Sequence, residues 1–312
     1  MFHDSYCRLG RFLVLGEVFL RIRRADERDL PALASIFAAS AEDLLRRYRS
    51  GDEDLLPVNA DAAVPVYRHL NDTGAVFVAE DPEPVAFSAA VVREGVWFLS
   101  QLWVLPERQG KGIGSALLDE TLSWGHGASA FTVVSSPHPG AQTLYLRRSM
   151  FPLWSQVDLL GDAGDAGEMP DGLAQLADAD QPWIDEIDRE VRGAARPVDH
   201  AFWRGSATGM VFHRDGGAGG YVYVWPPGGW SSKPKSKIGP GAVVDPRDMP
   251  NLLAAALQLA VGEVTLAVPS TNWSALNELV RLGFRPSVTN TFMASRALPD
   301  GSRYLSSGGS LA

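Results

Sequence analysis

The stretch that decides the fold reads Gln109-Gly110-Lys111-Gly112-Ile113-Gly114 and precedes an apolar helix predicted for Ser115–Trp124. Three glycines at alternate positions leave the backbone bare where this helix starts. The first N–H groups of a helix have no partner within it and share the positive end of the helix dipole. With Arg108 and Lys111 as local positive charge, the stretch predicts a site for phosphate oxygens. A glycine-rich turn that only redirects the chain is the alternative.

Other phosphate-binding and nucleophile motifs fit the sequence less well. A dinucleotide fingerprint that starts at Gly110 would need glycine where Ser115 stands. A Walker loop would need serine or threonine after Lys111, and Gly112 follows it. The Gly205–Gly209 stretch has Ala207 where a serine hydrolase places its nucleophile.

The region around this loop is half of an internal repeat. Val104-Leu105-Pro106 is echoed by Val244-Asp245-Pro246, an offset of 140, whereas Thr132 and Thr265 are offset by 133. The second copy has therefore lost seven residues, where the first carries the glycine stretch. In both copies a helix, a β-rich run and a second helix follow: Ser115–Trp124, Phe131–Ser135 and Ala141–Arg148; Asn251–Ala260, Val264–Val268 and Ser274–Leu282.

Each half is predicted to be α+β. Runs at Ala75–Glu80, Pro84–Arg93 and Val96–Leu105 predict an antiparallel meander, and Gly220–Trp225 and Ile238–Val244 predict strands in the second half. We therefore expect two tandem domains, each with a mixed, mostly antiparallel sheet flanked by helices. The expected segments are an extension (1–20), a first domain (21–160), a linker (161–172), a second domain (173–298) and a flexible tail (299–312).

Composition excludes several classes of protein. The chain has 312 residues, is 46% hydrophobic and 21% charged, and carries a net charge of −9. These values are those of a globular protein, and the charge argues against nucleic-acid or membrane partners. The apolar run 12–20 is too short to span a bilayer. One cysteine and six scattered histidines predict no disulfide and no metal site, so we expect a cytoplasmic protein; a homodimer is left open.

Together these motifs resemble the GNAT superfamily of acetyl-CoA-dependent N-acetyltransferases. Its Gln/Arg-x-x-Gly-x-Gly/Ala loop is matched by Gln109-x-x-Gly112-x-Gly114, after the strand–proline segment 102–106. Its later pattern is matched at Ala141, Leu144 and Tyr145, with His138 where asparagine is common. Ser149 and Met150 replace the usual Gly-Phe.

The second half looks like a degenerate copy of the same fold. It keeps Asn272, Ala275 and Gly283-Phe284 of the late motif, but it lacks the phosphate loop and has Leu279 in the place of Tyr145. We expect it to bind no acetyl-CoA by the standard route. The tandem layout is similar to that of mycothiol synthase in architecture.

The resemblance implies acetyl-CoA as the cofactor and a set of binding residues in the first half. The backbone N–H of Val104 would stabilise the oxyanion, and the main chain of Trp103 and Val104 would pair with pantetheine like an added strand. Tyr145 would protonate the leaving thiolate, since a phenol pKa of about 10 is close to a thiol pKa of about 8.5. The cofactor-binding candidates are Leu102, Trp103, Val104, Gln109, Gly110, Lys111, Gly112, Ile113, Gly114, Ser115, His138, Ala141 and Tyr145.

The general base is the least determined part of the site. The run Val96–Gln101 has no carboxylate where many relatives place one, so Glu94 and Glu80 are the candidates. Both are also explained as solvated acids at strand ends, and water relayed by Gln101 or Ser100 is an equal alternative.

The acceptor is expected to meet the early helices, within about residues 30–70. The acidic run Asp52-Glu53-Asp54 would attract a cationic amine, although such runs are usually only solvated. Trp97 and Trp103 are candidates for the wall of an apolar pocket, or for simple core positions.

The leading hypothesis is an N-acetyltransferase. It would move an acetyl group to a primary amine of a small molecule, or less favourably of a peptide, by direct attack through a tetrahedral intermediate. A non-catalytic acetyl-CoA-binding regulatory module is the alternative, and an interaction scaffold is the third.

Overall fold

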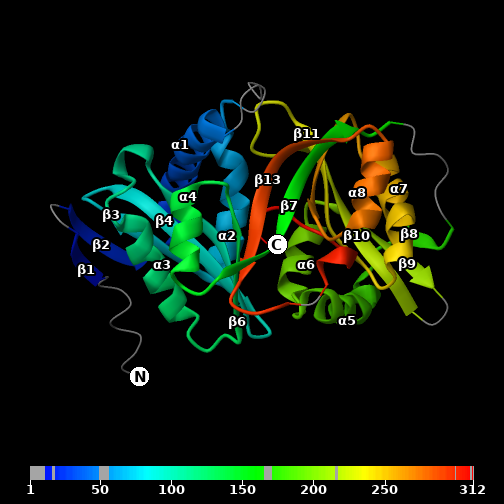
Figure 1. Cartoon of the computed structure of the whole chain (residues 1–312), viewed down its shortest axis with the longest axis horizontal. Coiled ribbons are helices and arrows are strands. Elements are labelled where there is room, and N and C mark those ends of the chain that lie inside the picture. Colours follow the sequence, from blue (N-terminus) through cyan, green and yellow to red (C-terminus); the bar gives the residue numbers. More distant parts are fainter. Residues whose placement is uncertain are drawn as a thin grey trace. The chain divides into compact units, whose positions relative to one another are not determined.

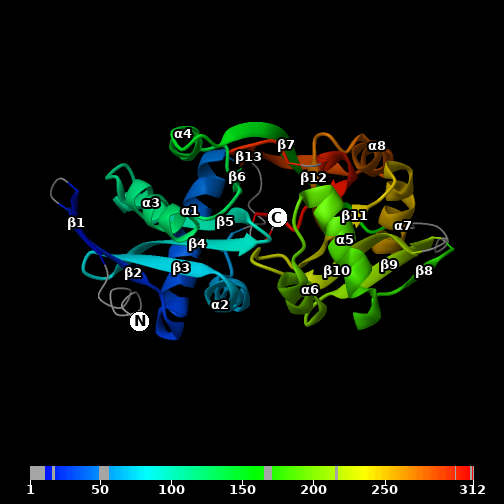
Figure 2. The same cartoon turned by 90° about the horizontal axis from the view of Figure 1, so that it is seen from below.

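The computed structural model describes residues 11–15, 18–48, 56–164, 171–214, 217–298, 300–309 and 311. The chain forms two compact units, both α+β (Figures 1 and 2). Unit 1 comprises Met1–Val92, Trp97–Ser129 and Gly229–Lys233; unit 2 comprises Arg93–Val96, Ala130–Gly228 and Pro234–Ala312. Residues 130–160 of the first half of the sequence therefore pack in unit 2. Residues Gly229–Lys233 of the second half pack in unit 1.

Unit 1 contains the expected meander, with strands in the order β1-β2-β3-β4-β5. All residues of β3 from Ala75 to Ala79 are buried, without the alternation of buried and exposed side chains that a half-exposed strand shows. Both faces of this strand are therefore covered. The strands are β1 (Arg11–Leu15), β2 (Val18–Arg24), β3 (Ala75–Glu80), β4 (Pro84–Arg93) and β5 (Val96–Val104), and the helices are α1 (Leu30–Tyr48), α2 (Val64–Thr73) and α3 (Ile113–Trp124).

The strands of unit 2 follow in the same 14-stranded sheet, in the order β6-β13-β7-β12-β11-β10-β9-β8, with β14 paired to β11. β13 lies between β6 and β7 and pairs antiparallel with both, which explains why 130–160 packs with the second half. The strands are β6 (Ala130–Ser135), β7 (Phe151–Asp162), β8 (Leu173–Gln175), β9 (Thr208–Arg214), β10 (Gly217–Gly228), β11 (Lys235–Val243), β12 (Glu263–Pro269), β13 (Arg285–Ala294) and β14 (Tyr304–Leu305); the helices are α4 (Pro139–Leu146), α5 (Gln181–Arg192), α6 (Pro197–Arg204), α7 (Met249–Leu259) and α8 (Trp273–Arg281).

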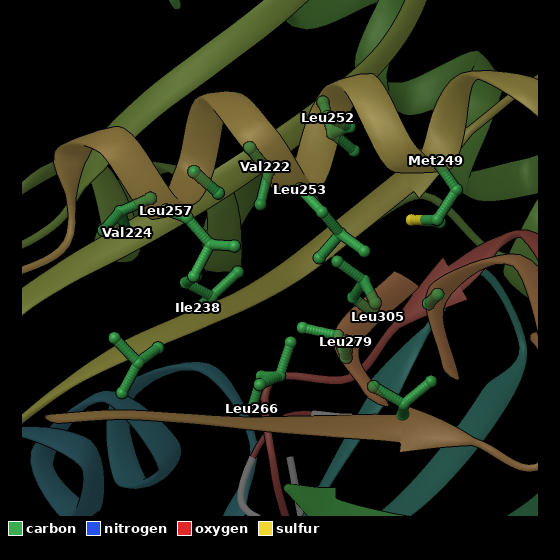
Figure 3. Packing of buried hydrophobic residues seen from close by; sticks show 14 of the residues in the cluster. Val222, Val224, Ile238, Met249, Leu252, Leu253, Leu257, Leu266, Leu279 and Leu305 are labelled. Atoms are coloured by element: carbon green, nitrogen blue, oxygen red, sulfur yellow. The ribbon is translucent and has the colours of Figure 1, made fainter. Parts of the chain in front are cut away.

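The core of unit 2 is an aliphatic layer between α7 and its sheet. Figure 3 shows Leu252, Leu253 and Leu257 of α7 together with Ile238 of β11 and Leu305 of β14. All are buried in one cluster. Truncating a buried leucine to alanine costs about 2–5 kcal/mol, so this layer contributes strongly to the stability of the unit.

A buried polar network lies on α5, α6 and β10 of unit 2. The Asp188 carboxylate accepts from Arg196 Nε at 2.8 Å, from His200 Nε2 at 3.0 Å and from the Tyr221 hydroxyl at 2.5 Å. Burial alone would raise the pKa of Asp188, but Arg196 and His200 outweigh it and hold that pKa well below its usual range. Burial lowers the pKa of His200, whose Nδ1 lies 3.0 Å from the Tyr223 hydroxyl. A charge buried with this many partners is satisfied, which is why the network is compatible with a core.

The segments predicted to lie outside the domains are partly structured. Residues 11–15 and 18–20 belong to the β1–β2 hairpin, and 161–162 belong to β7. Residues 304–305 form β14 against β11, and Arg196 Nη1 donates to the carbonyl oxygen of Leu311 at 3.0 Å. The described residues of 299–312 are thus packed against unit 2, in contrast to the flexible tail that their composition suggested. Residues 1–10, 16–17, 165–170, 299, 310 and 312 of these segments lie outside the described part.

Candidate active site

The carboxyl end of β5 is fixed by two side chains. The carbonyl oxygen of Val104 accepts from Ser40 Oγ at 3.0 Å and from Gln109 Nε2 at 3.1 Å. Leu105 N donates to the Val85 carbonyl at 3.0 Å. Ser40 belongs to α1, so this helix and the glycine stretch both hold the last residue of the strand. Gln109, the first residue of the matched loop, therefore has a positioning role.

The glycine stretch has the backbone geometry of an open cradle. Gly110 and Gly112 have φ of +76° and +83°, a left-handed conformation that disfavours side chains. Gly112 is the N-cap of α3, and no side chain caps that helix end. Gly110, Lys111 and Gly112 are exposed, whereas Ile113 is buried in the core of unit 1. The N–H groups of the first turn thus face an accessible surface, as a diphosphate site requires.

The two basic residues at this stretch have different roles. Arg108 Nη2 donates to the Asp81 carbonyl oxygen at 2.7 Å and pairs with the Asp81 carboxylate at 2.7 Å. Arg108 is therefore engaged in fixing the loop, and Lys111 is the exposed cation. Binding of an anion here rests on backbone amides and on Lys111.

His138 caps α4. Its Nδ1 accepts from Gly140 N at 3.1 Å and from Ala141 N at 3.3 Å, so Nδ1 carries no proton in this geometry. In the repeat, Asn272 Oδ1 accepts from Ala275 N at 3.0 Å in the same way. The imidazole thus replaces the asparagine amide as a cap, which gives the unusual residue at this position a physical reason.

Tyr145 lies on the buried face of α4. Its side chain is 5% exposed, and burial raises the pKa of the phenol well above its ordinary value. The hydroxyl is protonated at neutral pH, as an exposed tyrosine would also be, and its raised pKa makes it a weaker proton donor. After the helix, Ser149 adopts φ of +59° and Met150 is buried, as Gly283 (φ +89°) and Phe284 are in the repeat.

The two acidic candidates for the base are held by arginines. Glu94 receives Arg189 Nη2 at 2.9 Å and Ala195 N at 2.9 Å, and its hydrogen bond with Arg189 lowers its pKa. Glu80 pairs with Arg21 and Arg23. Glu94 also precedes β5, whose nine residues span about 30 Å at a rise of 3.3 Å each and end at Val104. This pairing and position argue against Glu94 as the base.

An aromatic cluster in unit 1 joins Trp103, a candidate from the sequence, to residues that the sequence did not single out. Phe37 of α1 makes edge contacts with Trp103 of β5 and Trp230, at ring-centroid distances of 5.2 and 6.3 Å. Tyr67 of α2 lies 6.3 Å from Phe37, and its buried hydroxyl has no hydrogen-bond partner among the described residues. Trp97, by contrast, is fully buried and belongs to the core. The acidic run 52–54 lies outside the described residues.

Acidic side chains stand at the corresponding helix start in the second half. Asp245 Oδ1 accepts from Arg247 N at 2.9 Å, and Asp248 stands at the N-cap of α7. The Asp248 carboxylate does not cap α7, but negative charge at this helix end would repel a phosphate. Leu279 is buried in the core, so the second half offers no counterpart to the Tyr145 hydroxyl.

Comparison with known families identifies the first half. Residues 38–150 match the model of the Acetyltransferase (GNAT) family. The chain contains a GNAT acetyltransferase domain. This confirms the resemblance read from the loop and from the late motif. A comparison with curated proteins finds no match.

Solved structures extend the likeness of the GNAT domain to the tandem arrangement. A putative acetyltransferase from Pyrococcus horikoshii is similar at TM-score 0.73 and 19% identity, covering 94% of each chain. A tandem GNAT protein from the clavulanic acid biosynthesis pathway is similar at TM-score 0.58 and 18% identity, covering 90% of this chain and 99% of that one. At these identities the likeness shows a shared fold, and it confirms the predicted α+β tandem architecture.

In the described part of the chain, His, Cys, Asp and Glu side chains do not gather in a group of three or more that would hold a metal ion. The described helices include none with the length and apolarity to cross a membrane.

Proposed function

We propose that this chain is an acetyl-CoA-dependent N-acetyltransferase that acetylates the primary amine of a small molecule. The observation that carries the proposal is the exposed, uncapped start of α3, with Gly110 and Gly112 in left-handed conformations directly after β5. A side chain at either glycine would be strained, and the bare amides there fit a diphosphate. The residues present therefore fit acetyl-CoA.

Each residue of the proposed site has a defined task. The first amides of α3 and the Lys111 ammonium would hold the diphosphate, and the main chain of Leu102, Trp103 and Val104 would pair with pantetheine amides. Bound acetyl-CoA supplies the acetyl group as a thioester. The N–H of Val104 would donate to the carbonyl oxygen as negative charge develops on it. Ser40 and Gln109 would keep Val104 in place.

The proton balance assigns the remaining step. The amine nitrogen forms a bond to the acetyl carbon while the carbon–sulfur bond breaks, and the thiolate would take a proton from the Tyr145 hydroxyl. The acylated nitrogen then loses a proton, which returns through solvent to the Tyr145 phenolate. The phenol is protonated at neutral pH, but because burial raises the pKa of Tyr145 it is a weaker acid than an exposed tyrosine. Before it attacks, the substrate ammonium loses one proton to water and becomes a neutral amine, since Glu80 and Glu94 are paired with arginines.

Thiol release from acetyl-CoA, measured with a panel of small primary amines and one peptide, tests the proposal. We expect turnover with small amines, and we expect Tyr145→Phe to lower kcat by about a hundredfold, the size of a lost general acid. The KM for acetyl-CoA should change less than about twofold, because this role concerns the leaving group. Tyr48→Phe, on an exposed residue of α1, is the matched control.

The pairing of both acids also favours a second candidate, a non-catalytic acetyl-CoA-binding module. Calorimetry separates the two: tight coenzyme binding with no turnover on any amine supports the module. Turnover that Tyr145→Phe leaves unchanged would instead remove the tyrosine from the acid role.

A further inference from the structure

The position of Trp230 points to the class of acceptor. Trp230 lies on the loop between β10 and β11, in the repeat that lacks the glycine cradle, yet the segment Gly229–Lys233 packs as part of unit 1. Asn59 N donates to the Trp230 carbonyl oxygen at 2.7 Å, which anchors the loop beside α2. The side chain is 39% exposed, so part of the ring is available to a ligand.

The ring of Trp230 continues an aromatic wall that begins at the proposed reaction centre. Trp103 directly precedes Val104, and Phe37 contacts both Trp103 and Trp230. Three aromatic rings in sequence favour an apolar body, because a hydrophilic body would lose hydration against them without gaining hydrogen bonds.

We infer that Trp230 is a specificity-determining residue that selects amines with an aromatic or aliphatic body. This inference rests on the proposed function. It assigns to the second half of the chain a part in choosing the substrate of the first.

Two amines that differ only in their body test it: 2-phenylethylamine and ethanolamine. We expect Trp230→Ala to raise the KM for 2-phenylethylamine by about tenfold, within the range for a lost hydrophobic contact. The KM values for ethanolamine and acetyl-CoA should change less than about twofold, and Trp230→Phe should keep most of the preference. Trp273→Ala, on a residue of α8 that is 74% exposed, is the control.

The outcomes separate the inference from the proposed function. Equal shifts for both amines, or no shift, overturn the role of Trp230 while turnover by the unmodified chain still supports acetyl transfer. If the unmodified chain turns over no amine, the proposed function fails first.

A second, independent observation concerns the segment Tyr304–Ser307. β11 and β12 pair in parallel only at three positions, the last being Ile238 with Leu266. Beyond this point β11 pairs with β14, at Gly241 with Leu305 and Ala242 with Tyr304, while Ser306 bridges Ala267 of β12. The segment therefore fills the wedge between two separating strands.

Several contacts hold this segment in place. Ser306 N donates to the Ala267 carbonyl at 2.9 Å, and Asn272 Nδ2 donates to the Tyr304 carbonyl at 3.0 Å. Lys237 Nζ donates to the Ser307 carbonyl. Leu305 is fully buried in the core of unit 2, as Figure 3 shows.

The repeat indicates what the segment replaces. The offset of 140 places Ala242 at the position of Leu102, where the first half is proposed to pair with pantetheine. The structure assigns the 304–307 segment as a built-in strand in the second copy's cofactor wedge. The second wedge is then filled by an extended peptide, which is residues 304–307 of the same chain. Each chain would therefore bind one acetyl-CoA, in the first half.

Hydrogen exchange on the full chain tests this directly. We expect the Ser306 amide to exchange within about tenfold of the rate for Leu266 of β12, and exchange at the rate of an unstructured amide would overturn the assignment. Ser306→Pro removes the N–H that binds Ala267, so it should lower Tm clearly more than Gly309→Pro, at an exposed bend. Equal effects would contradict the assignment.

Calorimetry with coenzyme A measures how many coenzyme molecules each chain binds. One molecule bound per chain is expected, and two would overturn the closed wedge. Absence of any binding would contradict the proposed function, while the exchange and Tm results would still decide the role of the segment.

Discussion

Ser40 Oγ donates a 3.0 Å hydrogen bond to the carbonyl oxygen of Val104, so α1 directly fixes the last residue of β5. Gln109 donates to the same oxygen, which makes the helix and the glycine stretch joint supports of one backbone position. Such support matters because an oxyanion donor acts only when it is already oriented.

Replacing Ser40 by alanine is expected to lower kcat by about tenfold, because Val104 loses one of two anchors. The free energy of unfolding should fall by only about 1 kcal/mol, the typical net value of one hydrogen bond. Steady-state kinetics and urea unfolding measure both. Ser35→Ala on the same helix, whose Oγ donates to the Pro31 carbonyl oxygen, should leave kcat unchanged. An equal loss in the two variants would contradict the role of Ser40.

Gly112→Ala should weaken coenzyme A binding by at least about tenfold in calorimetry. The residue has φ of +83°, and a side chain there costs about 1–2 kcal/mol and shifts the amides that would hold the diphosphate. Gly127→Ala is the control, since a Cβ at Gly127 meets nothing within 4 Å and its φ lies outside the left-handed region. An unchanged affinity of Gly112→Ala for coenzyme A would contradict the assignment of the glycine stretch as the binding site.

Glu94→Gln is expected to keep kcat within about twofold, with the same pH profile. Its carboxylate holds Arg189 and the Ala195 amide, so its loss is expected to affect stability instead. Because those hydrogen bonds lower its pKa, its stabilising effect is present above the unfolded pKa and is lost as the pH falls through the folded value. A collapse of kcat in this variant would restore Glu94 as the base.

The free energy of unfolding should decrease as the pH falls below about 6.5, partly through His200. Burial lowers the pKa of this histidine in the folded state, so the unfolded chain takes up the proton first and acid favours unfolding. His200→Gln should make this slope shallower between pH 5 and 7, whereas the exposed His126→Gln should not. Denaturant titrations at several pH values compare them, and identical slopes would rule out the contribution of His200.

Tyr67→Phe should leave the free energy of unfolding unchanged or slightly higher, because the buried hydroxyl has no partner among the described residues. Thermal unfolding measures this, with Phe87→Leu as a control that loses the ring at 5.2 Å from Tyr67. A loss above about 1 kcal/mol in Tyr67→Phe would show that the hydroxyl has a partner in solution.

Contacts between residues far apart in the sequence explain why parts of the site could not be predicted. Arg93 and Asp199 form a two-bond ion pair across 106 positions, and Arg189 reaches Glu94 across 95. No local pattern encodes these partners, so Glu94 looked like a free acid at a strand end. The lone residues Phe37, Tyr67 and Trp230 gave no signal either, because their significance comes from lying together.

The sequence by itself determined the features that depend on neighbouring residues. The glycine stretch 109–114 predicted a bare backbone at the helix start, and the repeat offset predicted two copies of one fold, only one with the cradle. These follow from local sterics and from hydrogen bonds within a few residues.

Only the tertiary structure decided the position of β13 between β6 and β7, the transfer of Trp230 to unit 1 and the packing of 304–307 into the wedge. A strand edge accepts any extended segment that completes its hydrogen bonds and buries its apolar face. Which segment does so depends on the whole chain, since the competing partners lie far apart in the sequence.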